Sequence, residues 1–300
     1  MTEKILAAPA GQHWASKKRN EKISNTLVFV VLLIGSVTML GPILWMLSTS
    51  LKTATEVFAI PPIWIPSPLH FENYPTAWNI SGMYATEGIT FTTYLINTLI
   101  IAGLSCIGTT LSSSVVAFAF ARLRFPGRGP LFLLCLATLM VPAQVTMVPS
   151  FILFNALGWR DTFYPLIVPA FLGGGAYNIF LMRQFFMSIP YEMDEAAKID
   201  GCTNFGVYYR ILLPLCKPAL TTVAVFSFVY NWNDFMNPLI YLDSNSKKTL
   251  ALGLTNFISL YGQDYHLLMA ASLLISIPIA IMFLVGQRYF IQGIATTGLK

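Results

Sequence analysis

Six strongly apolar stretches, each long enough to cross a lipid bilayer as a helix, constrain this sequence more than any other feature. Such a helix needs about 20 predominantly apolar residues. Charged residues make up 10% of the 300-residue chain and hydrophobic residues 55%, whereas soluble domains carry about 25% charged residues. We therefore predict an all-α, polytopic membrane protein with six transmembrane helices. The predicted spans cover residues 26–50, 94–120, 131–154, 162–187, 218–241 and 267–290.

The distribution of Lys and Arg predicts how these spans are oriented. With a cytoplasmic N-terminus, 14 of the 18 basic residues fall in the inner segments and the other four in the outer ones. Cytoplasmic loops carry such an excess of basic residues. We therefore expect a multi-pass protein with both termini in the cytoplasm, a disordered cytoplasmic tail over residues 1–24 and a transmembrane domain over residues 25–300.

Composition and motifs also argue against several functions. The net charge of +5 comes from basic residues in short loops between the apolar stretches, where they act as topology signals, so we predict no nucleic-acid partner. The four cysteines show no C-x-x-C pairing, which favours reduced packing residues and no metal site. The sequence lacks a G-x-x-x-x-G-K-[ST] phosphate-binding loop and a convincing catalytic constellation. We predict that the chain is not an enzyme and holds no cofactor.

A short polar segment, residues 190–214, separates the fourth and fifth apolar stretches on the predicted cytoplasmic side. Acidic residues in its first turn suit the positive end of a helix dipole. Gly201 is expected to end this first helix, because glycine accepts the left-handed backbone angles found at helix C-termini. Met193, Ala196 and Ala197 fall at positions i, i+3 and i+4 and predict one narrow apolar stripe.

A second short helix is expected to follow Gly201. Thr203 or Asn204 is the predicted cap, Phe205 lies on its surface, and Pro214 is expected to end it. Small residues beside exposed aromatic side chains suit a docking surface for a soluble partner. The alternative is a pair of helices that lie on the membrane with their aromatic side chains at headgroup level, and the residues alone leave both possibilities open.

The spacing of residues in this polar segment resembles a known motif. Glu195-Ala196-Ala197, then Asp200-Gly201, then Ile211-Leu212-Leu213-Pro214 is similar to the EAA loop of permease subunits in bacterial ATP-binding-cassette (ABC) importers. The resemblance implies two coupling helices that sit in a cleft of the ATP-hydrolysing subunit. The residues that it implies in ATPase coupling are Glu195, Ala196, Ala197, Asp200, Gly201, Phe205 and Pro214.

The resemblance extends over most of the chain after the N-terminal tail, and it is to the maltose-type sugar permeases, the G-type subunit in particular. It is carried by SLKTATEVFAIPPIWIPSPLHFENYPTAW from Ser50, MVPAQVTMVPSFILFNALGWRDT from Met140 and NWNDFMNPLIYL from Asn231. This resemblance implies a type I ABC importer permease fold in the bacterial cytoplasmic (inner) membrane. The implied partners are an F-type permease subunit in a heterodimer, two copies of an ATP-binding subunit that hold ATP and Mg, an extracytoplasmic sugar-binding protein and membrane lipid.

Two features inside the predicted spans bear on a transport pathway. Asn231, Trp232, Asn233 and Asp234 form a polar cluster in an apolar stretch, and an intramembrane Asp should face protein or water. The cluster is either a substrate contact or a structural anchor between two permease subunits. The triplet at residues 173–175 is all glycine, which indicates either a broken helix beside a pathway or a plain kink.

Taken together, these features favour a permease subunit of an ATP-driven sugar importer that forms half of the translocation pathway. An ion-gradient-driven secondary carrier is the first alternative, but such carriers need coupling carboxylates in the bundle and commonly show internal repeats. The chain has one acidic residue well inside a predicted span and no clear repeat. A permease for a polyol or glycerol phosphate is the second alternative.

Overall fold

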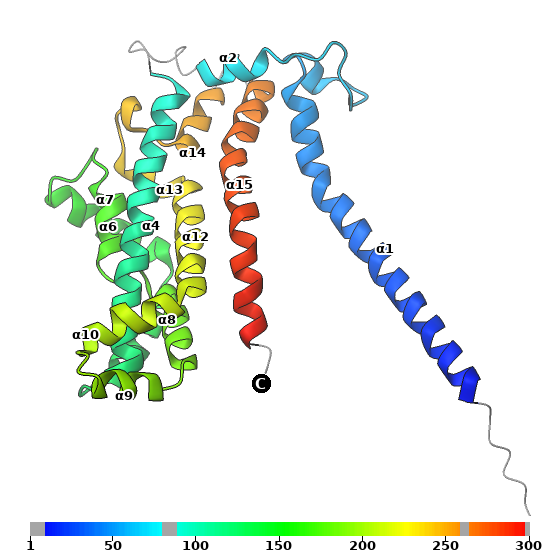
Figure 1. Cartoon of the computed structure of the whole chain (residues 1–300). Helices are drawn as coiled ribbons and strands as arrows, with labels where there is room; N and C mark the ends of the chain where they lie inside the picture. The colour runs from blue at the N-terminus through cyan, green and yellow to red at the C-terminus, as the bar shows by residue number, and fades with distance from the viewer. Residues whose placement is uncertain (1–9, 80–88, 259–263, 298–300) are drawn as a thin grey trace, which may run out of the picture.

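The computed structural model describes residues 10–79, 89–258 and 264–297 of the chain. These residues form an elongated bundle of helices, with short helices gathered at both ends (Figure 1). We call the two ends the α2 end and the α9 end, after a short helix that lies at each. The start of α1 and the end of α15 both point toward the α9 end (Figure 1).

The elements fall into long helices and short connecting ones. The helices that build the length of the bundle are α1 (Ala10–Ser50), α4 (Phe91–Arg122), α5 (Arg128–Ala137), α6 (Ala143–Ala156), α8 (Ala176–Ser188), α12 (Lys217–Trp232) and α15 (Tyr265–Thr297). The shorter helical elements are η1 (Glu56–Phe58), α2 (Asn73–Asn79), η2 (Thr138–Met140), α7 (Tyr164–Ile167), η3 (Val168–Phe171), α9 (Glu192–Ile199), α10 (Asn204–Val207), the π-helix η4 (Tyr208–Leu212), α11 (Leu213–Leu215), α13 (Met236–Tyr241), η5 (Asn245–Lys247), α14 (Leu250–Gly253) and η6 (Leu254–Phe257).

The all-α architecture is confirmed, but the count of six membrane spans is not. Among the described residues, four helices are long and apolar enough to cross a membrane, or up to six if each of two bent helix pairs forms one span. One bent pair joins α5 and η2 to α6 at 99°, and the other joins the run from α10 to α11 to α12 at 78°. The 99° bend lies inside the third predicted span, whereas the 78° bend lies at Cys216, just before the fifth. The fourth predicted span is interrupted between η3 and α8 and the fifth between α12 and α13, so three of the six predicted spans are not continuous helices.

Proline explains the breaks inside the third and fifth predicted spans. In the third, Pro142 follows Val141, whose extended backbone (φ −82°, ψ 115°) ends η2, because a residue before proline avoids the helical region. In the fifth, α12 ends at Trp232 and α13 starts at Met236. Pro238 lies four residues after Asp234, and a proline ring there clashes with the Asp234 carbonyl of a continuous helix.

The first helix starts earlier than the sequence predicts. α1 begins at Ala10, so the expectation of disorder is wrong for residues 10–24, which are helical; the candidate membrane span within α1 covers Glu21–Ser50. Residues 1–9 lie outside the described part of the chain. None of the most apolar stretch of α1 is buried, and the helix leans away from the bundle while it packs on α15 (Figure 1).

Helix α4 is the central element, and small side chains on it allow close packing. α8 and α12 both pack along α4. At Gly108, a Cβ atom would lie 2.6 Å from the Phe171 ring, so only glycine admits η3 this closely. Small residues let helix backbones approach each other in membranes, where apolar side chains alone give little preference for protein over lipid.

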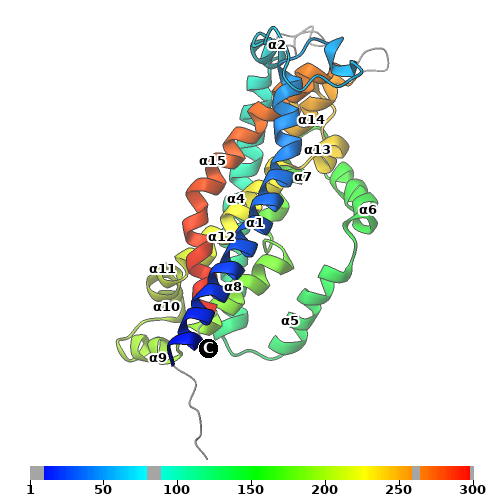
Figure 2. The same cartoon turned by 90° about the vertical axis from the view of Figure 1, so that its right-hand side faces the viewer.

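Two hydrophobic clusters hold the bundle, one near each end. The cluster at the α9 end joins α4 and α8 to the segment that leads into α12 and includes Phe118, Phe186 and Tyr208. The cluster at the α2 end joins α2, α4, α12, α14 and α15 and includes Phe91 and Trp232. By contrast, α5, η2 and α6 have no buried residue. We call these three elements the α5–α6 arm, which bows outward from the bundle (Figure 2).

Candidate functional site

The α9–α11 segment, residues 190–215, forms a two-part helical connection between α8 and α12 at the α9 end (Figure 1). Its first half folds as the sequence predicts. Gly201 has φ +83°, and the next amide, of Cys202, donates to the Ala197 carbonyl at 2.9 Å. This pattern closes the C-terminus of α9 and needs the left-handed angle that glycine adopts without strain.

The second half differs from the prediction at its end. Thr203 is the cap, since its Oγ1 accepts a hydrogen bond from the Gly206 amide at 3.1 Å. Pro214 does not end the helix, which passes through the π-helix η4 and continues in α11 to Leu215. A π-turn widens the hydrogen-bonded loop by one residue relative to an α-helix.

A buried ion pair fixes the α9–α11 segment to the bundle. The Arg122 Nε atom, on α4, lies 3.5 Å from Asp194 Oδ2, on α9, and the two side chains are 5% and 3% exposed. Arg122 also donates to the carbonyls of Phe186 and Ile189, at 2.6 and 2.7 Å. Burial raises the pKa of Asp194, and the positive charges of Arg122 and Lys198 oppose that shift. One guanidinium thus ties α4, the end of α8 and α9 together.

Sequence reasoning missed this pair. From the sequence alone, Arg122 is one of the basic residues that predict orientation, and Asp194 is one of the acidic residues that suit the helix dipole. The inward face of α9 is Asp194 with Ala197. Of the predicted stripe, only Ala197 packs on the bundle, whereas Met193 and Ala196 are exposed. The available signal was the i, i+3 spacing of Asp194 and Ala197.

The residues that the EAA resemblance implies divide between an exposed and a buried set. Phe205 is 69% exposed and Ala197 only 5%. Glu195, Ala196, Asp200, Gly201 and Pro214 are exposed. Between α9 and α10 lies a notch of about 430 Å³. It is lined by Asp200, Gly201, Cys202, Thr203, Phe205, Gly206, Tyr209 and Arg210.

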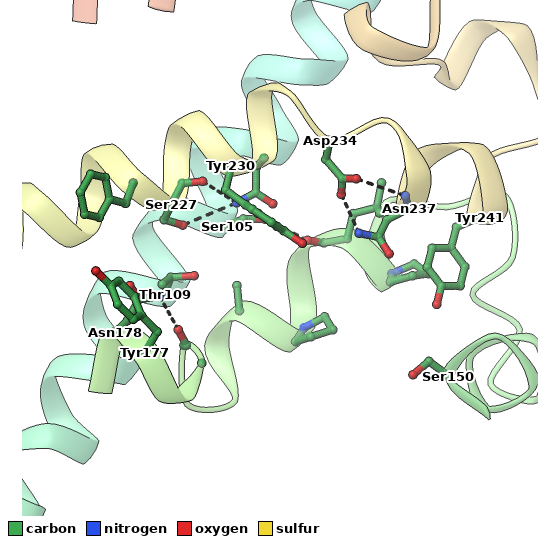
Figure 3. A pocket seen from close by; sticks show the side chains of 18 of the residues that line it. Ser105, Thr109, Ser150, Tyr177, Asn178, Ser227, Tyr230, Asp234, Asn237 and Tyr241 are labelled. Carbon is green, nitrogen blue, oxygen red and sulfur yellow. Dashed lines mark hydrogen bonds between the residues drawn. The ribbon is translucent and has the colours of Figure 1, made fainter. Parts of the chain in front are cut away.

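A second site is a cavity of about 530 Å³ within the bundle, which we call the central cavity (Figure 3). Its walls come from α4, α6, α7, η3, α8, α12 and α13 and from the glycine turn before α8. Its polar and aromatic lining residues are Ser105, Thr109, Ser150, Phe154, Tyr177, Asn178, Phe226, Ser227, Tyr230, Asn231, Asp234, Asn237 and Tyr241. Ligand pockets commonly have volumes of about 300–1,000 Å³.

The predicted polar cluster on α12 is split between two surroundings. Asn231 and Asp234 line the central cavity. Trp232 is 1% exposed, and its indole N–H donates to the Ile275 carbonyl of α15 at 3.2 Å, so it anchors helices. Asn233 is exposed and donates to the Val229 carbonyl one turn earlier. Only two of the four residues are therefore placed to meet a solute in this cavity.

The glycine triplet forms a helix break beside the central cavity, as one of its two interpretations predicts. Gly173, Gly174 and Gly175 have φ values of +120°, +69° and +86°. Two carbonyls around the break accept hydrogen bonds from side chains. The Ser112 hydroxyl donates to the Ala170 carbonyl, and the Asn178 side-chain amide donates to the Gly174 carbonyl, both at 2.8 Å. Irregular backbone at membrane depth is tolerated where side chains satisfy it in this way.

Several cavity residues had no signal of their own in the sequence. Tyr177 and Asn178 on α8, Tyr230 on α12 and Asn237 on α13 come from separate elements and meet only in the fold (Figure 3). Each lies in a mostly apolar stretch, and its sequence neighbours do not indicate which residues of the other elements it meets. A search for polar residues on a shared helical face would have brought Ser227 together with Tyr230 and Asp234, which lie at i, i+3 and i+7.

A polar clasp joins two loops toward the α2 end. Asp161 accepts hydrogen bonds from the backbone amides of Asp243 and Ser244, both at 3.0 Å, and from the Ser244 hydroxyl at 2.6 Å. Its carboxylate also pairs with Lys247 Nζ at 2.9 Å. Burial works to raise the pKa of Asp161, but the hydrogen bonds from Ser244, Lys247 and Asp243 outweigh it and hold the pKa well below its usual range.

No group of three or more His, Cys, Asp or Glu side chains among the described residues is arranged to hold a metal ion. The chemistry that these sites offer is recognition: a protein surface at the α9 end and a polar, aromatic-lined cavity in the bundle. Neither site presents an arrangement of nucleophile and base.

Comparisons with known proteins agree with this architecture. A family model described as "Binding-protein-dependent transport system inner membrane component" matches residues 113–296. The probable ABC transporter permease protein YurM of Bacillus subtilis is 35% identical over 284 residues, which cover 94% of this chain and 91% of the relative. The arabinooligosaccharides transport system permease protein AraQ of Halalkalibacterium halodurans is 35% identical over 261 residues, which cover 86% and 90%.

A solved structure shows the same fold. It is the crystal structure of a bacterial ABC transporter involved in the import of the acidic polysaccharide alginate, and one of its chains superposes on this one with a TM-score of 0.76 at 24% sequence identity. The match covers 91% of this chain and 98% of that chain. At this level of identity the comparison establishes the arrangement of helices.

Proposed function

Because this chain belongs to the family of binding-protein-dependent transport system inner membrane components, we propose that it is one permease subunit of an ATP-driven saccharide importer. The family assignment makes it a membrane component of a transport system and not an enzyme. The relative AraQ is named for arabinooligosaccharide transport, which supports a saccharide cargo. An ion-gradient-driven carrier is not favoured, since the family depends on a binding protein.

The observation that carries this proposal is the exposed notch on a segment whose other face is anchored in the core. The α9–α11 segment exposes Glu195 on α9 and lines the notch with Phe205, and a separate ATPase subunit would dock on this surface. On its inner face, the Arg122–Asp194 pair and a 2.7 Å hydrogen bond between Tyr208 and Ser114 attach it to α4. A force applied at the notch would therefore be transmitted to the bundle through these contacts.

The residues that would contact the ATPase are those implied by the EAA motif and exposed here. Glu195 would offer its carboxylate, Phe205 would fill an apolar pocket, and the backbone at Gly201 would allow close approach. Ala197 acts from the buried side, where it packs α9 against the bundle. Pro214 does not line the notch, so we assign it no contact with the ATPase; it would affect the path of the helix through α11.

The central cavity would be this subunit's half of the translocation pathway. α8 and α12 both line it, and the α9–α11 segment is the covalent link between them. Movement of that segment therefore reaches two walls of the cavity directly. Asn231 and Asp234 are the members of the predicted cluster that serve the pathway, whereas Trp232 and Asn233 serve structure.

The partners follow from which surfaces remain uncovered. The α5–α6 arm has no buried residue, and a second permease subunit of the F-type would cover it in a heterodimer. Two ATP-binding subunits, which hold ATP and Mg, would dock at the α9 end, and an extracytoplasmic sugar-binding protein at the α2 end. This arrangement puts both termini in the cytoplasm of a bacterial cell and the α2 end outside its cytoplasmic membrane.

Cross-linking at the notch tests the coupling. We expect Glu195→Cys to cross-link to the ATPase subunit in membranes that contain the whole transporter, with a yield that changes between ATP-bound and nucleotide-free states. Thr76→Cys, exposed on α2 at the other end, is the matched control and should give no such product. Capture by Thr76→Cys and not by Glu195→Cys would contradict the proposal.

Uptake into proteoliposomes tests the energy source. We expect transport of a radiolabelled oligosaccharide retained by the cognate binding protein to require the second permease subunit, the ATPase, the binding protein and ATP together. Uptake by this chain alone, driven by an ion gradient, would refute the importer assignment.

A further inference from the structure

We propose that the central cavity excludes anionic solutes, that Asp234 is the residue that excludes them, and that the cargo is an uncharged saccharide. This inference rests on the proposed import function and adds the charge of the cargo to it. The question is open within the fold, since AraQ is named for arabinooligosaccharides and the superposed transporter for an acidic polysaccharide.

The composition of the cavity wall supports a neutral cargo. Asp234 is the one side chain with a formal charge among the described residues that line it, and no Lys, Arg or His does. The tyrosines at positions 177, 230 and 241 offer ring faces, and the asparagines at 178, 231 and 237 offer amide donors and acceptors. Such groups form hydrogen bonds with hydroxyls and stack on sugar rings, but they do not neutralise a carboxylate or a phosphate.

The geometry of Asp234 keeps its carboxylate in the cavity wall without a counter-ion. Asn237 donates to it twice, from its backbone amide at 3.2 Å and from its side-chain amide at 2.8 Å (Figure 3). None of the ion pairs found among the described residues involves Asp234. Its charge is therefore held by neutral donors and remains able to act on a solute.

Two basic residues, Lys247 of the clasp and Arg160, which pairs with the clasp residue Asp243, are already engaged. Arg160 pairs with Asp243 at 2.8 Å and Lys247 with Asp161 at 2.9 Å, and neither lines the cavity. The effective dielectric constant in a partly buried site is well below that of water. A second negative charge that enters the cavity is therefore repelled more strongly than it would be in solution.

A purely structural role for Asp234 makes a different prediction. Asp234 accepts the Asn237 amide at the start of α13, so it also helps to shape the break after α12. Asparagine retains an acceptor oxygen for this bond but carries no charge, whereas glutamate keeps the charge. The pair Asp234→Asn and Asp234→Glu thus separates the electrostatic role from the structural one.

The test measures the charge selectivity of the cavity directly. In membranes that contain the full-length chain with its partner subunits, Ser150→Cys places a thiol in the cavity wall. Its rate of modification is measured with two methanethiosulfonate reagents, one with a trimethylammonium group and one with a sulfonate. Labelling that also occurs in the parent chain is subtracted, because the parent has cysteines of its own. The rate for the cationic reagent is then divided by the rate for the anionic one, and this ratio is normalised to the same ratio measured with free 2-mercaptoethanol.

We expect the normalised ratio to favour the cationic reagent by about tenfold or more, because the carboxylate attracts one reagent and repels the other. Asp234→Asn should bring the ratio to within about threefold of free solution, and Asp234→Glu should preserve the bias. Asp243→Asn is the matched control, since its carboxylate is paired with Arg160 outside the cavity wall, and it should leave the ratio unchanged.

Three outcomes would overturn the proposal: no bias in the Ser150→Cys chain, a bias that persists in Asp234→Asn, or no reaction with either reagent, which would mean that water does not reach the cavity. The modification needs neither ATP nor cargo. If the reconstituted importer failed to transport, the measured charge selectivity would still hold. If the two reagents reacted at equal normalised rates, the importer assignment would still hold.

Discussion

At the scale of single residues, Gly201 is the position where the backbone itself limits the side chain. Its φ of +83° lies in the left-handed region, yet no heavy atom lies within 4 Å of the place where a Cβ would stand. A substitution there would therefore strain the backbone without causing a steric clash.

We predict that Gly201→Ala destabilises the folded protein by about 1–2 kcal/mol, the cost of a left-handed angle for an ordinary residue. The thermal unfolding midpoint of the purified protein in detergent measures this. Gly206→Ala is the matched control, because it lies in α10 and its Cβ would meet neighbours only at 3.5 Å or more. Alanine there should be neutral or stabilising. Equal losses in both variants would contradict the backbone argument.

Local chemistry was enough to predict Gly201 but not Asp194. The turn at Gly201 depends on the torsion angles of one residue, which its chemistry fixes. Whether Asp194 or Met193 points inward depends on Arg122, which lies on another helix and was assigned to the membrane boundary by its charge alone. For the same reason Asp234 could be identified as an unusual residue, while its neighbours in the cavity could not.

At the scale of elements, the Arg122–Asp194 pair decides whether α9 stays on the bundle. Removing one partner of a buried ion pair leaves an uncompensated charge and typically costs about 3–5 kcal/mol, whereas replacing both by apolar residues costs much less. We therefore predict that Arg122→Met loses more stability than the double variant Arg122→Met with Asp194→Leu.

Unfolding of the single and double variants in detergent measures the difference. Arg210→Met, at an exposed position on η4, is the matched control and should change stability by no more than about 0.5 kcal/mol. A double variant as unstable as Arg122→Met would mean that Arg122 acts mainly through its bonds to the Phe186 and Ile189 carbonyls.

The sequence was enough to predict that the apolar stretches form helices, but not whether each stretch forms one continuous helix. Apolar stretches identified the helices, because burying backbone in lipid requires internal hydrogen bonds. Pro142 and Pro238 signal where two of these stretches break, but neither proline specifies the 99° angle between α5 and α6. Pro214 is a third case, since the helix runs through it by way of the π-helix η4 and ends one residue later, at the 78° bend before α12.

At the scale of the whole molecule, the clasp around Asp161 holds together loops that follow α6 and α13. Its pKa is lowered from the ordinary value of 3.8, so the folded state favours the ionised form. Such a group adds stability above pH 3.8, and that stability is lost as the pH falls from 3.8 toward the lower folded-state pKa.

We predict that Asp161→Asn lowers the thermal unfolding midpoint at pH 7 and that its difference from the parent chain shrinks as the pH falls below 3.8. Asp243→Asn, which breaks only a pair whose side chains are 56% and 52% exposed, should have a smaller effect with little pH dependence over the same window. If the difference in unfolding midpoint between Asp161→Asn and the parent chain stays constant down to strongly acidic pH, then the carboxylate charge is not what holds the clasp.

The covalent order of α8, the α9–α11 segment and α12 also fixes how many steps an opening motion takes. Because a single connection, attached to α4 through Arg122 and Tyr208, carries both helices, we expect dyes on α8 and α12 to report one shared transition, with no interval in which α8 has moved and α12 has not. Opening and closing would then have a single kinetic barrier in this subunit, and a lengthened connection would split that barrier into two.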